Sequence, residues 1–235
     1  MSFGLICEGP TDQAAIENIL CGIFQNEDLL ELITALQPGS ASEGNLDGGW
    51  ERVLLYLANH KFRQSFSMVS NVVVQIDTDV AGMKNFDVDL RDTEGIVIKD
   101  VAQIVSKVKQ RLIDQINSGE ADFYERHSKR IVFAITVHSL EIWLFKHYSK
   151  MKQKQSTINS GEKKLALELQ KDKKLSEFTI KVKNKEVLMS KNYDNYESLT
   201  RPFFDKKTRD QSIQGLYESD LSFRSFKDDV HQLQP

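Results

Sequence analysis

The sequence predicts an α/β protein with a mostly parallel sheet flanked by helices. Within the first 150 residues, short apolar runs alternate with segments whose apolar side chains recur at helical spacing. This alternation is typical of parallel sheets, because a helix connects each strand to the next. Acidic residues follow three of the apolar runs, and ligands of such sheets bind at the carboxyl ends of the strands.

The expected elements follow one another closely along the chain. Strands are expected at residues 3–8, 72–76 and 130–137. Amphipathic helices are expected at residues 9–24, 50–62, 97–116 and 139–148. The composition of residues 29–38 fits a strand or a helix equally well, and residues 40–49 form a polar, glycine-rich loop.

The last third of the chain has a weaker pattern. We expect residues 1–150 to form the main domain and residues 151–235 to form a smaller, lysine-rich, mainly helical extension that packs on it. Residues 152–164 are interpreted as a polar linker or loop. Short helices are expected at 164–175 and 222–233.

Composition excludes several classes of protein. The two cysteines, Cys7 and Cys21, rule out a disulfide framework and a cysteine zinc site. No secretion signal and no apolar run long enough to span a bilayer are present, so a cytoplasmic protein without a membrane partner is expected. The net charge of -3 predicts no global attraction to nucleic acid, but residues 146–191 contain thirteen lysines against five acids. This segment is either a nucleic-acid-binding flank or a solvated lysine-rich face.

Acidic residues stand where the predicted strands end. Asp77 and Asp79 follow the run VVVQI, and residues two apart on a strand face the same way. Two carboxylates on one side of a strand end require a cation or a raised pKa. Glu8, with Asp12 about one helical turn later, follows the first strand, and Glu141 follows the third. The sequence therefore predicts a carboxylate cluster at one edge of the sheet.

Each of these residues also has a structural interpretation. Asp77 and Asp79 could form a strand-ending turn, and Asp12 could stabilise a helix dipole. Glu141 lies in a helix that is apolar nearly all round, and a buried acid needs a cation or hydrogen-bond donors. His138 is interpreted as a core histidine rather than a group that supports the cluster. The two tryptophans, Trp50 and Trp143, are interpreted as packing residues.

Two segments resemble the motifs of TOPRIM domains. CEGPTD is similar to the glutamate motif of that family, and IDTDVAG is similar to its Asp-x-Asp motif, in the same order along the chain. The resemblance covers roughly the first 150 residues. Within the family, the OLD (overcoming lysogenization defect) nucleases also have an acid near the position of Asp12 and an element similar to Ser139-Leu140-Glu141. Small stand-alone TOPRIM proteins of bacterial anti-phage defence are similar as well.

The resemblance implies a TOPRIM-like fold and a metal-dependent nuclease that cleaves DNA or RNA in prokaryotic anti-phage defence. Mg²⁺ or Mn²⁺ would be the cofactor, with one ion at Asp77 and Asp79 and a second near Glu8, Asp12 and Glu141. Glu8 is alternatively the general acid or base. A lysine, Lys191 or Lys99, could offset phosphate charge. No GxxxxGK[ST] stretch is present, so any ATP control would come from a partner ATPase, and a homodimer is possible.

Two other classes of function remain open. A non-catalytic module, TOPRIM-like or receiver-like, would bind metal and a partner ATPase without cleaving nucleic acid. A receiver would place an acid pair after its first strand and a lysine after its last strand, and that lysine is not identified here. A Rossmann dinucleotide enzyme is the weaker choice, because GxGxxG is missing after the first strand.

Overall fold

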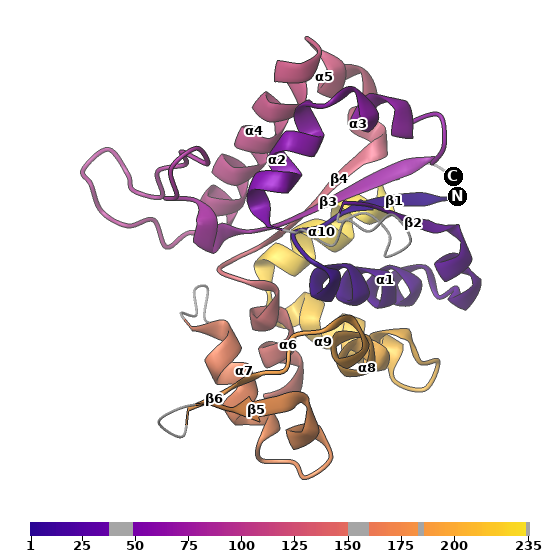
Figure 1. The fold of residues 1–235 in the computed structure, drawn as a ribbon, viewed down its shortest axis with the longest axis vertical. Helices are drawn as coiled ribbons and strands as arrows, with labels where there is room; N and C mark the ends of the chain where they lie inside the picture. Colours follow the sequence, from indigo (N-terminus) through magenta and orange to yellow (C-terminus); the bar gives the residue numbers. More distant parts are fainter. Residues whose placement is uncertain (38–48, 150–159, 183–185, 234–235) are drawn as a thin grey trace.

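The computed structural model confirms the α/β fold class. It describes residues 1–37, 49–149, 160–182 and 186–233. Four parallel strands form the central sheet in the order β2-β1-β3-β4 (Figure 1). Their bounds are Phe3–Ile6 for β1, Ile33–Gln37 for β2, Asn71–Asp77 for β3 and Ile131–Thr136 for β4. Because β1, β3 and β4 are neighbours, their carboxyl ends meet at one edge.

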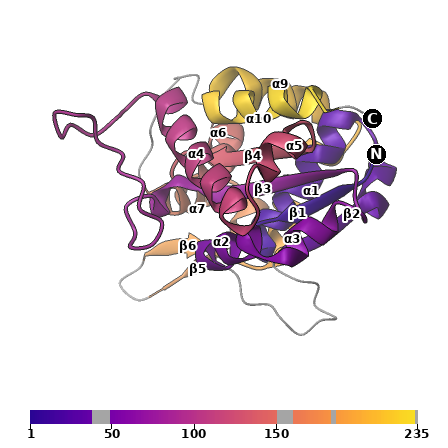
Figure 2. The same cartoon turned by 90° about the horizontal axis from the view of Figure 1, so that it is seen from above.

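Helices cover both faces of the sheet, as Figures 1 and 2 show. Successive residues of a strand point to opposite faces, so Val72, Val74 and Ile76 pack against one layer while Val73 packs against the other. The first layer contains α2 (Trp50–Ala58), α3 (His60–Ser65), α4 (Val101–Gly119) and α5 (Phe123–His127). The second contains α1 (Pro10–Phe24), α6 (Leu140–Tyr148) and α10 (Leu221–His231).

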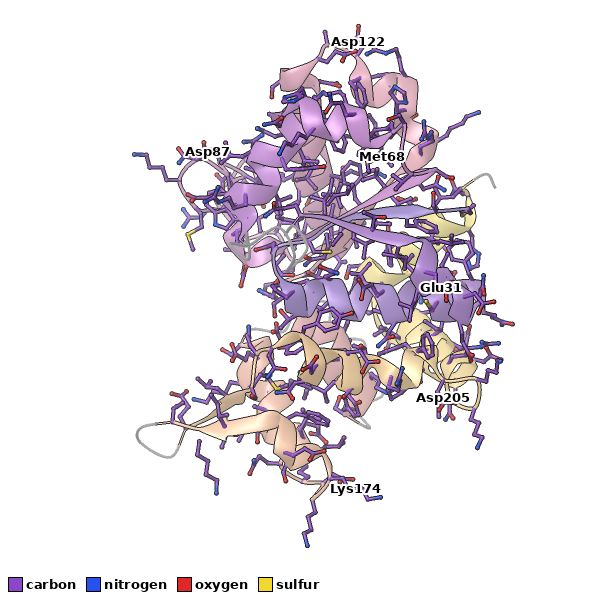
Figure 3. All side chains as sticks on the ribbon, turned by 45° about the vertical axis from the view of Figure 1, so that its right-hand side comes forward. Glu31, Met68, Asp87, Asp122, Lys174 and Asp205 are labelled. Carbon is purple, nitrogen blue, oxygen red and sulfur yellow. The ribbon has the colours of Figure 1, made fainter. Side chains whose placement is uncertain are left out.

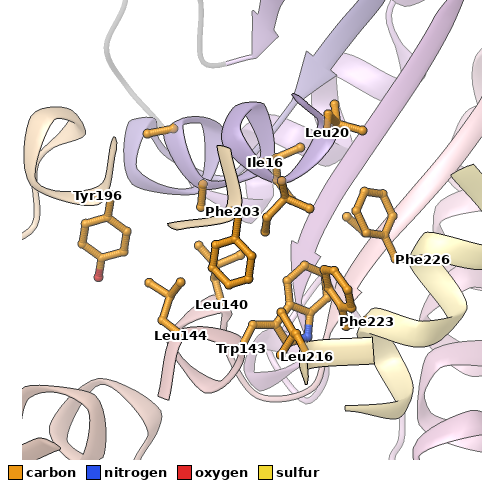
Figure 4. Close-up of a cluster of buried hydrophobic side chains, with 14 of the residues drawn as sticks. Ile16, Leu20, Leu140, Trp143, Leu144, Tyr196, Phe203, Leu216, Phe223 and Phe226 are labelled. Carbon is orange, nitrogen blue, oxygen red and sulfur yellow. The ribbon is translucent and has the colours of Figure 1, made fainter. Parts of the chain in front are cut away.

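Residues beyond 160 add a further layer outside α1. Its elements are α7 (Gly161–Leu169), β5 (Thr179–Lys181), β6 (Val187–Met189), α8 (Tyr193–Phe204) and α9 (Arg209–Ser219). The helix α8 lies along α1, and a Cβ at Gly22 would collide with the carbonyl oxygen of Phe203. Glycine at this position therefore allows the two helices to approach closely. Figure 4 shows the shared core, in which Leu216 of α9 and Phe223 of α10 lie beside Trp143 of α6.

Several sequence expectations are confirmed and others are wrong. Trp143 is fully buried against Phe223 and Phe226, and Trp50 packs edge-on against Phe86, so both tryptophans are packing residues. The single helix predicted for residues 50–62 is two helices, because the Asn59 side chain accepts a hydrogen bond from Lys61 N and begins α3.

The structure also assigns elements to the segments whose sequence pattern was ambiguous or weak, as far as these residues are described. Residues 29–37 contain the end of the 3₁₀ helix η1 (Glu27–Leu32) and then β2. The helix predicted at 164–175 begins earlier, at Gly161, and ends at Leu169. Much of the predicted glycine-rich loop and of the predicted linker lies outside the described residues. Within the described segments, every helix falls short of the length or apolarity that a bilayer span requires.

Candidate functional site

Glu8 and Asp77 meet where the neighbouring strands β1 and β3 end. The Glu8 Oε1 atom accepts a hydrogen bond from the backbone N–H of Asp77 at 2.7 Å. Both side chains are partly buried. The parallel pairing of β1 with β3 therefore brings together two acids that are 69 positions apart in the sequence.

The Asp77 carboxylate is held by two buried polar side chains. Gln75 Nε2 donates to Asp77 Oδ1 at 2.9 Å, while Gln75 Oε1 accepts from Glu8 N at 3.1 Å. Thr136 Oγ1 also donates to Asp77 Oδ1. Gln75 has no exposed surface and interrupts an apolar strand. That interruption was a signal in the sequence, since a buried amide needs partners.

Asp79 does not share a strand face with Asp77. The strand ends at Asp77, and Asp79 lies in the 3₁₀ helix η3 (Thr78–Val80), where its side chain is exposed. Asp79 N donates to the His138 carbonyl oxygen at 3.1 Å. The expectation of two converging strand-end carboxylates is therefore wrong in its geometry, because the strand ends two residues before Asp79. His138 is not a core histidine either, because it is partly exposed beside η3.

Glu141 is the most deeply buried acid of the group. It lies in the first turn of α6 with 5% of its surface exposed. Its Oε1 atom accepts from Tyr196 Oη at 2.7 Å and pairs with Lys191 Nζ at 2.9 Å. Burial raises the pKa of Glu141, but the charge of Lys191 and hydrogen bonds from Ser139, Tyr196 and Lys191 together hold it below its usual value. A buried acid has thus found both a cation and donors, as the sequence argument required.

Lys191 brings positive charge to the site from the C-terminal part of the chain. Its Nζ lies 2.9 Å from Glu141 Oε1 and 3.3 Å from Glu162 Oε2, and 47% of its side chain is exposed. Burial lowers the pKa of Lys191, but the two glutamates raise it by more than burial lowers it. The net shift is therefore upward, and Lys191 stays charged. Lys99, the other lysine considered from the sequence, lines a cavity on the far side of Asp79 instead.

The other acids of the group ionise less readily than free carboxyl groups, because they are buried beside one another. Burial, then the charges of Asp12, Asp79 and Glu141, raise the pKa of Glu8 to about 8, despite the hydrogen bond from Asp77. Burial and Glu141 raise the pKa of Asp12 to about 7. Burial, Asp12, Glu8 and Glu141 raise the pKa of Asp77 well above its usual range. Asp12 lies in the first turn of α1, where a favourable helix dipole alone would lower its pKa, so the raised pKa reflects burial and the charge of Glu141.

The donor chemistry of this cluster fits a hard divalent cation. Among the described residues, no group of three or more His, Cys, Asp or Glu side chains is arranged to hold one ion directly. Mg²⁺ does not need such a cage, because it keeps several waters and takes one or two carboxylates together with substrate phosphates. Carboxylate oxygens are its preferred ligands, and a cation would allow Glu8, Asp12 and Asp77 to ionise together despite their burial and mutual repulsion.

The fold and the site define an α/β protein with carboxylates gathered at the carboxyl ends of parallel strands. The sequence model of one family, described as Domain of unknown function (DUF4276), matches residues 7–176. Since this is more than half of the chain, the protein belongs to the DUF4276 family. The matched segment contains the five predicted acids and ends before Lys191. No curated protein and no solved structure matches the sequence.

Proposed function

We propose that this protein is a TOPRIM-like nuclease that hydrolyses phosphodiester bonds of DNA or RNA with Mg²⁺ or Mn²⁺. The observation that carries the proposal is the meeting of Glu8 and Asp77 at the ends of the neighbouring strands β1 and β3, with Asp12 in the first turn of α1. Burial and neighbouring carboxylates raise the pKa values of all three acids. Perturbed acids of this kind concentrate at functional sites. A role in anti-phage defence, with an ATPase partner, extends the same family resemblance.

The protein's own side chains have distinct tasks in this proposal. Glu8 and Asp77 would hold an ion, with Gln75 and Thr136 fixing the orientation of the Asp77 carboxylate. When bound, such an ion polarises the scissile phosphate and lowers the pKa of a water. Asp12, Asp79 and Glu141 add negative charge around this position.

Lys191 and Glu8 supply the remaining chemistry. Half-exposed and held by Glu141 and Glu162, Lys191 can face a phosphate and offset the charge that develops in the transition state. Glu8, with a pKa of about 8, holds a proton on a large share of molecules at neutral pH when no cation replaces it. As the alternative to holding the ion, Glu8 could therefore exchange a proton with the reacting oxygens.

A non-catalytic metal-binding module is the second candidate. The meeting of Glu8 and Asp77 serves this candidate as well, because holding an ion between two carboxylates requires no turnover. Such a module would be stabilised by metal ions without turning over any nucleic acid. The two candidates therefore differ in turnover, which a direct assay measures.

The experiment is cleavage of plasmid, single-stranded DNA and transfer RNA with Mg²⁺ or Mn²⁺. Wild type is compared with Asp77→Asn, Glu8→Gln and, as a matched control, Glu31→Gln. Glu31 is an exposed acid of η1 far along the surface from the strand ends (Figure 3). We expect metal-dependent cleavage that both cluster variants lose and that Glu31→Gln retains. Cleavage that survives in Asp77→Asn and Glu8→Gln would refute the assignment of the site.

A further inference from the structure

A large cavity adjoins the acid cluster on the side of Asp79. Its volume is about 830 Å³, within the range of small-molecule sites. Thr78, Asp79 and His138 form the wall next to the cluster, and residues 87–91 and 97–99 form the opposite wall. Asp79 therefore belongs to both the cluster and the cavity, so a ligand in the cavity lies beside the proposed reaction centre.

The outer wall is a folded excursion of the chain rather than a loose loop. Residues between η3 and α4 leave the body of the molecule, as Figure 1 shows, and Asp87 lies on this excursion in Figure 3. Arg91 and Val97 form an antiparallel bridge within it. Lys107 Nζ of α4 donates to Asp89 O at 3.0 Å, and Arg111 Nε donates to Phe86 O at 2.9 Å. These bonds tie the wall to α4, so the cavity exists without a ligand.

The chemistry of the lining fits a flat apolar group with polar edges. Apolar side chains from both walls line it, among them Val88, Ile98, Ile104 and Val137, all of which are buried. Asp87 and Asp89 add carboxylates, which accept hydrogen bonds from the amino groups of bases. Arg91 and Lys99 are exposed cations of the same lining, and such cations pair with phosphates.

We propose that this cavity receives an unpaired base of the strand whose phosphodiester bond the acid cluster cleaves. The substrate is then single-stranded nucleic acid, or a duplex with an unpaired nucleotide beside the scissile bond. A paired base would first have to leave its stack, which costs binding energy. This inference rests on the proposed nuclease function for its cleavage step, but base binding can be measured without cleavage.

Gly82 offers a way to fill the cavity without disturbing the fold. It lines the cavity, its φ lies outside the left-handed region, and a Cβ added there meets no atom within 4 Å. We therefore expect the ring of Gly82→Phe to occupy part of the cavity. Gly215→Phe on α9 is the matched control, because a Cβ there also meets no atom within 4 Å.

The test measures binding of fluorescent 12-nucleotide strands by anisotropy in Mg²⁺, with full-length Asp77→Asn so that no strand is cut. The strands are intact, carry one abasic position at each site in turn, or are paired into a blunt duplex. We expect the single strand to bind at least 10-fold more tightly than the duplex. One abasic position should weaken binding roughly 5- to 100-fold, the usual effect of losing one base contact. A free nucleoside monophosphate should compete only weakly, because it lacks the flanking phosphates.

The added Gly82→Phe change should make the intact and abasic strands bind equally, while Gly215→Phe should leave their difference unchanged. Equal binding of duplex and single strand, no effect of any abasic position, or equal effects of the two phenylalanines would overturn the inference. Full competition by the free nucleotide would also overturn it, since the cavity would then be a nucleotide site. If the binding pattern holds but wild type cleaves none of the strands, the nuclease proposal fails and the base site stands.

Discussion

Replacing aspartate by asparagine should change the stability of this protein in opposite directions at two positions, Asp77 and Asp220. Asp77 lies among Glu8, Asp12 and Glu141, and their charges oppose its ionisation. Asp220, at the start of α10, instead pairs with Lys146 Nζ at 2.7 Å, and the two side chains are 6% and 7% exposed. We expect Asp77→Asn to stabilise the metal-free protein and Asp220→Asn to destabilise it.

The expected magnitudes follow from the two environments. The rise in the pKa of Glu8 from 4.5 to about 8 corresponds to about 5 kcal/mol, at about 1.4 kcal/mol per pKa unit. Burial is its largest cause and water screens the partly exposed site, so we assign about 1–2 kcal/mol to repulsion between carboxylates. The repulsion on Glu8 comes from Asp12, Asp79 and Glu141. Asp77 meets repulsion of the same kind from Asp12, Glu8 and Glu141, and on the same scale Asp77→Asn should raise Tm by about 2–8 °C for a chain of this length.

Asp220→Asn should change the unfolding free energy by more than Asp77→Asn does, because it leaves the buried charge of Lys146 without its partner. Breaking a buried ion pair in this way costs about 3–5 kcal/mol. Asp220 Oδ1 also accepts hydrogen bonds from Ser222 Oγ and Phe223 N, which an asparagine oxygen can retain. The expected fall in Tm is therefore about 6–20 °C, and it comes mainly from Lys146.

The assay is thermal and urea denaturation at pH 8 in EDTA and then in 10 mM Mg²⁺. Wild type should gain stability from the ion, and Asp77→Asn should gain much less, because a ligand and its charge are gone. Asp220→Asn should keep the full metal-dependent gain. If Asp77→Asn destabilised the metal-free protein as Asp220→Asn does, the carboxylates would not repel one another and the argument for a cation site would be refuted.

Three further predictions concern pH, charge and packing. In EDTA, the unfolding free energy should fall by at least about 2 kcal/mol as pH rises from about 4.5 to 8, because the folded state keeps protons on Glu8 and Asp12 that the unfolded chain releases, and the shift of Glu8 alone corresponds to about 5 kcal/mol before screening; a pH series of urea denaturation checks this, and a rise would contradict it. Lys191→Met should slow single-turnover cleavage about 100-fold, whereas Lys191→Arg, which keeps the charge, should lose less; equal rates for both would remove the charge argument. Trp143→Ala should cost about 3–5 kcal/mol in urea denaturation, since its ring packs against Phe223 and Phe226; a cost below 1 kcal/mol would contradict the packing.

The sheet and the position of the acids could be predicted because both depend on local patterns and one general rule. Buried parallel strands are apolar throughout, so VVVQI and IVFAIT stand out in the sequence. The rule that parallel strands end at one edge then places Glu8 near Asp77 and predicts Glu141 nearby. What the rule does not give is the residue at which a strand ends. The same IDTD segment fits a strand through Asp79 or a strand followed by the turn η3.

The contacts of Glu141 with Lys191 and Tyr196 could not be predicted, because no local sequence pattern indicates them. Lys191 precedes α8 and Tyr196 lies within it, some 50 residues after Glu141. A lysine near an apolar helix usually lies on a solvated face, and a tyrosine at helical spacing is usually a packing residue. Both residues gain their role only when α8 packs beside α1 and α6.

The burial of α1 in the structure shows what the C-terminal layer covers. Every residue from Ala14 to Ile23 is buried, whereas a helix on the surface of a sheet buries only one side. The sheet covers one side of α1, and α8 and α9 cover the outer side (Figure 1). The helix expected to be amphipathic is therefore buried on both sides, because the weakly patterned C-terminal residues form a second covering layer. The same packing that completes the core brings Lys191 and Tyr196 to Glu141, so the electrostatics of the site depend on residues that lie mostly beyond the segment shared with the DUF4276 family.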